Sequence, residues 1–276
     1  MKQSRNPIGV FDSGYGGLTV LNNLIQRLPG YDYLYLGDNA RAPYGSRSFE
    51  TVYQYTLGCV KWLFAQGCPL VILACNTASA KALRTIQQHD LPKMAPGLRV
   101  LGIVRPTSEI IGRFSKNKKI GILATTGTVQ SGSYEIEIKK FFPEVQVIQE
   151  ACPMWVPLIE NNEQDSHGAD YFVKKNIQNL LEKDPLIDTI LLACTHYPLM
   201  LKKITEHTPL DIKILTQGTI TANSLADYLE RHPEIAAKLS KHSQRSFFTT
   251  DSTEDFDLHG SHFFGGAIHS EHLDLS

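Results

Sequence analysis

Two cysteines occupy matching positions in this chain. Cys75 lies in LVILACNTAS and Cys194 in LLACTHYP, so each follows an apolar run and precedes small polar residues. We expect a helix to begin soon after each cysteine. Its free N–H groups and partial positive charge would favour a thiolate and could bind a substrate carboxylate. The two motifs therefore predict a pair of thiols that exchange protons.

A buried cysteine is also a common small residue of protein cores. We interpret Cys59 and Cys68 in that way, because nothing around either of them indicates chemistry. For Cys75 and Cys194 the shared sequence context favours the functional interpretation.

Asp12 and Ser13 also follow an apolar run, in IGVFDSGYGG. An aspartate at the end of a buried strand would lie at the mouth of the same site, and the glycines that follow let the backbone approach a ligand closely. The alternative is that Asp12 or Ser13 only caps a helix. The glycine pattern is neither a phosphate loop nor a dinucleotide fingerprint.

His196 lies two residues after Cys194 and could orient a substrate group or exchange protons with a thiol. Cys194 and His196 could also belong to a metal site, but no third or fourth ligand follows at a suitable spacing, so we predict no metal. Glu160, in VPLIE, is a candidate partner for a substrate ammonium group, and the alternative is a solvated helix residue.

The segment GDNARAPYGSRS predicts a fixed loop over the ligand, formed by Pro43, Tyr44 and Gly45. We interpret Asp38 and Arg41, in the same segment, as an ion pair on the surface.

Eight short apolar runs predict buried strands, because they are rich in branched residues and bounded by glycine, proline or polar residues. They are IGVF from Ile8, YLYLG from Tyr33, LVILA from Leu70, RVLGIV from Arg99, KIGILA from Lys119, VQVI from Val145, TILLA from Thr189 and KIL from Lys213. Helical spacing follows Ser48 and continues from Tyr171, and ANSLADYLE and RSFFTT predict a further helix and strand. Strands that alternate with helices predict an α/β fold with parallel sheets.

The chain also contains what we interpret as an internal repeat. IGVFDSGYGG is similar to IGILATTGTV, and VILACNTASA is similar to ILLACTHYPL, in the same order. We therefore expect two similar α/β domains, the first formed by residues 1–100 and completed by 210–276, the second by residues 101–209. Ligands bind at the carboxyl ends of parallel strands, so the two cysteines would face each other across a cleft.

Composition sets broad limits on the function. The chain has 276 residues, 42% of them hydrophobic, and a formal net charge of -1, which indicates a folded core and does not favour nucleic acid or an anionic membrane as a partner. The N-terminus has no long apolar segment typical of a signal peptide. Gly67 and Pro69 interrupt the longest uncharged stretch, residues 62–80, so it is no membrane span. Five scattered cysteines are typical of reduced thiols, so we expect a cytoplasmic protein.

Taken together, these motifs resemble the glutamate racemases of the aspartate/glutamate racemase superfamily. The matching stretches run in family order over nearly the whole chain and are GVFDSGYGGLTVL, GDNARAPYGSRS, ACNTASA, ILATTGTVQSGSY, ACPMWVPLIE, ACTHYPL, FFTTD and FFGG. Within the superfamily, ACTHYP indicates glutamate rather than aspartate.

The resemblance implies two α/β domains with the active site between them. It implies interconversion of L- and D-glutamate without pyridoxal phosphate, any other cofactor or a metal, with D-glutamate passing into peptidoglycan precursors for the cell wall. Small enzymes of this family are often homodimers. By the resemblance, Cys75 and Cys194 form the acid–base pair, with Cys75 acting on D-glutamate and Cys194 on L-glutamate. The residues that would contact glutamate are Asp12, Ser13, Tyr44, Gly45, Asn76, Thr77, Thr195 and His196, of which Asp12 and His196 would also assist proton transfer.

Two thiols suit this reaction because racemisation removes the α-proton from one face of the substrate and returns a proton to the other. Without a cofactor as electron sink, hydrogen-bond donors to the α-carboxylate must stabilise the carbanion. The loops at Asn76–Thr77 and Thr195–His196 are suited to that task.

The sequence departs from the family pattern at two places. Asn39 stands where threonine is commoner, which we expect to be harmless. TQG at 216–218 replaces a stretch that usually resembles Asp-Ser-Gly, which puts substrate affinity or regulation in question.

Three other functions were compared with this one. The first is a related enzyme of the superfamily, such as an aspartate racemase. The second is a non-catalytic protein that binds an amino acid, which needs no paired thiols. The third is a thiol redox protein, against which the absence of a C-x-x-C motif argues.

Overall fold

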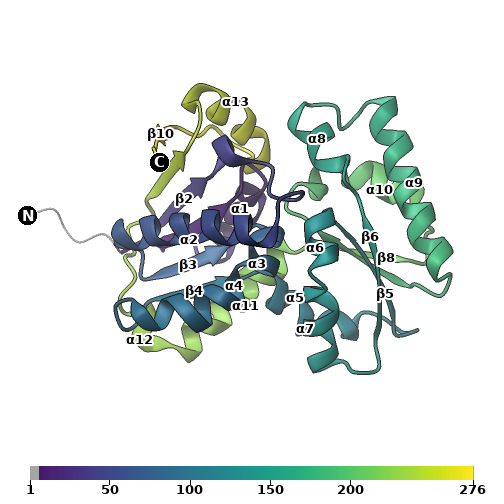
Figure 1. Cartoon of the computed structure of the whole chain (residues 1–276), viewed down its shortest axis with the longest axis horizontal. Helices are drawn as coiled ribbons and strands as arrows, with labels where there is room; N and C mark the ends of the chain where they lie inside the picture. The colour runs from purple at the N-terminus through teal and green to yellow at the C-terminus, as the bar shows by residue number, and fades with distance from the viewer. Residues whose placement is uncertain (1–5, 276) are drawn as a thin grey trace, which may run out of the picture.

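Two parallel β-sheets lie side by side in the computed structural model, which describes residues 6–275 (Figure 1). The strand order is β10-β9-β2-β1-β3-β4 in the first sheet and β6-β5-β7-β8 in the second. The strands are β1 (Ile8–Asp12), β2 (Tyr33–Gly37), β3 (Leu70–Leu73), β4 (Arg99–Gly102), β5 (Lys119–Ala124), β6 (Gln146–Ala151), β7 (Thr189–Ala193), β8 (Lys213–Leu215), β9 (Arg245–Thr249) and β10 (Ser270–His272).

All eight apolar runs form strands, and RSFFTT forms β9. Strands β1, β2 and β7 are buried along their whole length, which explains why their sequences are apolar at successive positions. The sequence did not predict β10, a short edge strand of polar residues beside β9.

Helices lie along both sheets. They are α1 (Gly17–Arg27), α2 (Phe49–Ala65), α3 (Asn76–Lys81), α4 (Leu83–Thr85), α5 (Val104–Ser108), α6 (Thr126–Gln130), α7 (Ser133–Phe141), α8 (Trp155–Glu160), α9 (His167–Lys183), α10 (Leu201–His207), α11 (Gly218–Arg231), α12 (Pro233–Ala236) and α13 (Thr253–Phe264). The predicted helices are α2, α9 and α11. Ser48 begins α2 by accepting a hydrogen bond from the N–H of Thr51, as a good N-cap does.

The two sheets share one strand order, which supports the repeat in the sequence. In the first half β1 lies between β2 and β3, and β4 follows at the edge. In the second half β5 lies between β6 and β7, and β8 follows. Each IGVF-like strand is therefore central, and each cysteine motif follows the strand on the same side of it.

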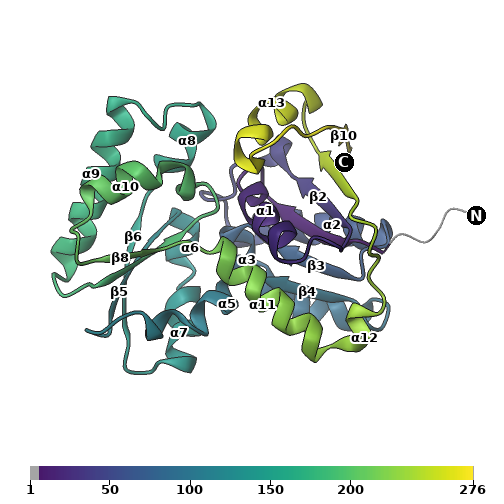
Figure 2. The same ribbon diagram turned by 180° about the vertical axis from the view of Figure 1, so that it is seen from behind.

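The chain crosses between the halves twice. It leaves the first sheet after β4 and returns after β8 through α11, which packs against α1 and runs beneath β4 in the view of Figure 2. Strand β9 then pairs with β2, so the C-terminal segment completes the first sheet. We expected the first domain to resume at residue 210, whereas β8 (Lys213–Leu215) pairs with β7 of the second sheet. The reason is that Leu215 packs into the apolar core of the second half.

The uncharged stretch from Trp62 contains the end of α2, a turn and β3. Gly67 makes the turn with a φ of 88°, a conformation that glycine adopts without strain. Within residues 6–275, none of the helices has the length and apolar character needed to span a membrane.

Candidate active site

A cavity of about 160 Å³ lies between the two halves, and both halves line it. Every residue that the sequence predicted for the site lines this cavity, except Asp12. The lining residues used below are Ser13, Tyr44, Gly45, Cys75, Asn76 and Thr77 from the first half, and Thr125, Cys152, Glu160, Cys194, Thr195 and His196 from the second.

The strand order brings the reactive groups together. In the first sheet β1 pairs with β3, with Phe11 opposite Leu73, so Asp12 and Cys75 emerge from the same sheet edge. In the second sheet Ala124 lies opposite Ala193, and Cys194 follows directly. Each half therefore presents one thiol from the carboxyl end of an equivalent strand.

The thiol of Cys75 is buried and caps a helix. Its sulfur accepts a hydrogen bond from the N–H of Ala78, 3.4 Å away, in the first turn of α3, and lies 3.4 Å from the hydroxyl of Ser13. Burial raises the pKa of Cys75 to about 12, and the neighbouring charges of Asp12 and Cys194 add to the rise. Cys75 therefore holds its proton at neutral pH and is ready to donate it.

The surroundings of Cys194 differ. Its sulfur lies 3.8 Å from Nδ1 of His196, whose Nε2 lies 3.0 Å from the carboxylate of Glu160. Burial alone lowers the pKa of His196, but its hydrogen bonds with Cys194 and Glu160 raise that pKa well above its ordinary value. His196 is thereby placed to exchange a proton with the thiol of Cys194.

The helix expected after Cys194 begins later and in a tighter form. A 3₁₀ helix, Tyr197–Met200, comes first, and α10 follows it. Cys194 therefore does not cap a helix as Cys75 does, and in this structure its charged neighbour is the histidine.

Asp12 lies beneath the cavity and is fully buried. Its carboxylate accepts hydrogen bonds from the N–H of Gly14, 3.0 Å away, and from the hydroxyl of Thr195, 3.5 Å away on the other half. Burial raises the pKa of Asp12, although His196 and the N–H groups of Gly17 and Gly14 lower it. Helix α1 begins at Gly17, and its N-cap residue, Gly16, supplies no side-chain cap. Asp12 contacts both halves of the site and is no simple N-cap.

The loop at Tyr44 closes one side of the cavity. The hydroxyl of Tyr44 donates to Asp38, which also binds Arg41 at 2.8 Å. Asp38 and Arg41 do form a pair, but our interpretation of it as a surface pair is wrong, since Asp38 is fully buried. The carbonyl of Gly45 accepts from the N–H of Gly127 at 2.7 Å, which ties the loop to the second half.

Glu160 comes from the C-terminal end of α8 in the second half, and its side chain is 23% exposed. This exposure leaves one side of the carboxylate open to a ligand, while Oε1 contacts His196. From this position Glu160 can contact a substrate ammonium group and can also orient the imidazole of His196.

Several cavity residues were missed from the sequence, among them Thr125 and Cys152. Thr125 follows β5 as Ser13 follows β1, and its hydroxyl lies 2.9 Å from that of Thr77 across the two halves. Cys152 follows β6, and burial raises its pKa well above the ordinary value. A residue-by-residue alignment of the two repeats would have indicated Thr125.

Cys59 and Cys68 are fully buried among apolar residues of the first half and do not line the cavity. The described part of the chain contains no group of three or more His, Cys, Asp or Glu side chains arranged to hold a metal ion.

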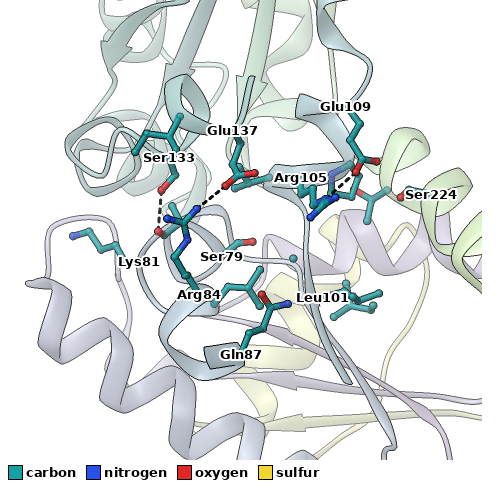
Figure 3. A pocket seen from close by; sticks show the side chains of 18 of the residues that line it. Ser79, Lys81, Arg84, Gln87, Leu101, Arg105, Glu109, Ser133, Glu137 and Ser224 are labelled. Carbon is teal, nitrogen blue, oxygen red and sulfur yellow. Dashed lines mark hydrogen bonds and ion pairs between the residues drawn. The ribbon is translucent and has the colours of Figure 1, made fainter. Parts of the chain in front are cut away.

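A second cavity between the halves is larger, at about 670 Å³ (Figure 3). Figure 3 shows two ion pairs in it: Arg84 contacts Glu137 at 3.0 Å, and Arg105 contacts Glu109 at 2.8 Å. It is lined by none of the cysteines or other predicted site residues. The predicted reactive groups therefore gather at the smaller cavity, which is the candidate active site.

Two similar α/β halves with a thiol from each in one cavity define a class of acid–base enzymes that work on both faces of a substrate. The family model for Asp/Glu/Hydantoin racemases matches residues 8–225, and the chain belongs to this family.

Individual relatives indicate which members of the family the chain is similar to in sequence and structure. The chain is 36% identical over 261 residues to the glutamate racemase of Geobacter metallireducens, covering 95% of this chain and 93% of that protein. Its structure is similar to that of a glutamate racemase from Bacillus anthracis, with a TM-score of 0.89, 33% identity and 99% of both chains covered. It is also similar to the glutamate racemase of Francisella tularensis in complex with D-glutamate, with a TM-score of 0.87, 29% identity and 99% of both chains covered.

Proposed function

We propose that this protein is a glutamate racemase that interconverts L- and D-glutamate with Cys75 and Cys194 as its acid–base pair. The observation that carries the proposal is the cavity itself, which is lined by Cys75 and Cys194, the thiols that follow equivalent strands of the two halves. Full-length similarity to glutamate racemases supports the choice of substrate.

The two thiols have different neighbours. The imidazole of His196 lies 3.8 Å from Cys194 and is held by Glu160, so it can take up the proton of that thiol, whereas burial keeps Cys75 protonated. We therefore assign Cys194 as the base that acts on L-glutamate and Cys75 as the acid on the opposite face.

The reaction then needs two proton transfers. The thiolate of Cys194 takes the α-proton and becomes a thiol, and the electron pair of the broken C–H bond stays on the substrate as a carbanion. The thiol of Cys75 gives its proton to the opposite face of the α-carbon and becomes a thiolate. D-glutamate results, and the reverse reaction begins from this second state of the enzyme.

The intermediate needs stabilisation, because its negative charge spreads onto the α-carboxylate. Hydrogen-bond donors fixed before the reaction stabilise such charge most effectively in a site that excludes water. The hydroxyls of Thr77 and Thr195 line the cavity with such donors. Ser13 and Asp12 lie beside Cys75 and assist the return of its proton.

The mechanism requires two reduced thiols, so a cytoplasmic location is part of the proposal. There the product, D-glutamate, is available for peptidoglycan synthesis.

The test is circular dichroism of an L-glutamate solution after addition of the purified protein, with a chelator and no cofactor. Decay of the signal to zero would support cofactor-free racemisation. A constant signal from folded protein would contradict the proposal, and the same assay with L-aspartate would then test the related activity. Solvent deuterium at the α-position of recovered glutamate would separate catalysis from simple binding.

A further inference from the structure

Behind Asn76, three buried side chains form a closed ring of hydrogen bonds. Asn76 donates from Nδ2 to Oε1 of Gln217 at 2.7 Å. Gln217 donates from Nε2 to the hydroxyl of Tyr134 at 2.6 Å, and Tyr134 donates to Oδ1 of Asn76 at 2.5 Å. Within the ring each side chain donates one hydrogen bond and accepts one, so the bonds run in a single direction around it.

The ring connects both places where the chain crosses between the halves. Gln217 lies directly before α11, at the second crossing. Its Nε2 also lies 3.1 Å from the hydroxyl of Thr107 and 3.3 Å from the carbonyl of Ile103, at the first crossing. Tyr134 belongs to α7 of the second half, and Asn76 follows the catalytic thiol Cys75 in the first. One amide group thus links the cavity wall to both crossings.

Gln217 belongs to the TQG stretch that departs from the family pattern. Its side chain is 4% exposed, and a buried amide stays in place only where its donors and acceptor are satisfied. Here they are satisfied by Asn76, Tyr134 and Thr107. The unusual glutamine is therefore fitted to this position and does not belong to a variable surface loop.

The ring also decides which way the amide of Asn76 faces. Oδ1 is held by Tyr134 and one hydrogen of Nδ2 by Gln217, so the second hydrogen of Nδ2 remains, and no bond to it is formed within residues 6–275. Asn76 lines the cavity. A rotation of this amide by half a turn would exchange a donor for an acceptor, and an acceptor repels a carboxylate.

We propose that Gln217 is a positioning residue, which holds the amide of Asn76 in the orientation that donates a hydrogen bond to an anionic oxygen of the substrate. The inference rests on the proposed racemase function. It predicts that loss of the ring weakens binding of glutamate in the ground state and the transition state alike, which raises KM and leaves kcat nearly unchanged.

Two variants test the ring. Gln217→Met keeps the length of the side chain and removes its hydrogen bonds, and Tyr134→Phe removes only the hydroxyl. Each is expected to raise KM for both enantiomers about tenfold, with kcat within about threefold of the parent. Because the ring acts as a unit, the double variant should be no worse than either single variant.

Arg84→Met is the matched control. It breaks the ion pair with Glu137, which also joins the two halves but involves an arginine side chain that is 62% exposed (Figure 3). Its KM should stay within about twofold of the parent, since exposed pairs contribute little.

The outcomes separate the two proposals. If the parent is active and folded Gln217→Met has the same KM as the parent, the role of Gln217 is overturned and the racemase proposal stands. The role of Gln217 is also overturned if the increases in KM of the two single variants multiply in the double variant. If Gln217→Met fails to fold, an unchanged KM in Tyr134→Phe overturns it equally. A parent that racemises neither enantiomer overturns the glutamate racemase proposal, and this inference with it.

Discussion

At the scale of single residues, the two thiols occupy equivalent positions and differ in their neighbours. Cys75 has a hydroxyl, a helix N–H and a carboxylate nearby, whereas Cys194 has an imidazole. The imidazole beside Cys194 can exchange a proton with that thiol, whereas burial holds the proton on Cys75.

The first prediction separates the two faces of the reaction. Cys75→Ser and Cys194→Ser should each lower racemisation by at least about 10³-fold, because a hydroxyl is a poor replacement for a thiol in proton transfer. In deuterium oxide, Cys75→Ser should still exchange the α-proton of L-glutamate without forming D-glutamate. Cys194→Ser should do the same with D-glutamate. Proton NMR of the recovered glutamate measures both.

Cys59→Ser is the control for these variants, since Cys59 is buried outside the cavity. It should keep activity close to that of the parent. Full racemisation by either active-site variant, or exchange of the opposite enantiomer, would contradict the assignment of the thiols.

A second prediction concerns His196. Replacing it by asparagine removes the cation beside Cys194 and should lower kcat/KM by about 10²–10⁴-fold. The loss must be equal for L- and D-glutamate, because the equilibrium constant of a racemisation is one. Its raised pKa means that His196 stays charged through neutral pH and loses its charge only as pH rises through that raised value.

The pH profile of kcat/KM tests the direction of the pKa shift of His196. In the parent, activity should fall on the alkaline side as His196 loses its proton. That limb should be missing from the profile of His196→Asn. An unaltered profile in the variant would show that another group titrates there.

At the scale of elements, the strands were predictable because the physics that buries them also determines their sequences. A parallel strand covered on both faces is apolar at successive positions, and eight such runs were visible. The edge strand β10 has no such signal, since its residues are polar and partly exposed. The short helices around the cavity are similarly fixed by contacts distant in the sequence.

The site was predictable to the same extent. Cys75 and Cys194 follow apolar strands and Asp12 ends one, so a local pattern marks them. The partners of Gln217 lie 141, 83 and 110 residues away in the chain, and no local pattern carries that information. The sequence therefore indicated that the stretch at 216–218 was unusual, and the fold showed which contacts its glutamine makes.

A third prediction concerns the strand that completes the first sheet. Asp32, just before β2, accepts hydrogen bonds at 2.8 Å from the N–H groups of His242 and Gln244, just before β9. Burial raises the pKa of Asp32, but these bonds outweigh it and hold the pKa below its ordinary value. Asp32→Ala should lower the free energy of unfolding by about 1–3 kcal/mol at neutral pH.

The pH dependence of that loss follows from the sign of the shift. Because the folded pKa lies below the unfolded value of about 3.9, the contribution of Asp32 is complete above the unfolded pKa and is lost as pH falls through the folded one. Urea unfolding at neutral and acid pH should show the gap between parent and variant narrowing. The exposed Asp211→Ala is the control, and a gap that is constant with pH would contradict the role of the charge.

At the scale of the whole molecule, the site exists only where the two halves meet. Cys75 comes from one half and Cys194 from the other, and polar contacts of 2.7–3.5 Å cross the junction: Gly45 with Gly127, Thr77 with Thr125, and Thr195 with Asp12. The relative position of the halves therefore determines the distance between the two thiols and the substrate, and a small displacement changes both proton transfers.

The fourth prediction tests this dependence through the loop at Gly45. A side chain there would place its Cβ 3.0 Å from Cβ of Thr125, so Gly45→Val must push the loop and the second half apart. We expect kcat/KM to fall by roughly 10- to 100-fold, because displacements of about 1 Å are enough to disturb a reactive geometry. Gly30→Val makes the same change where nothing lies within 4 Å and should retain parent activity. If Gly45→Val racemises glutamate as fast as Gly30→Val does, the site tolerates separation of its halves, and the packing at Gly45 does not control the reaction.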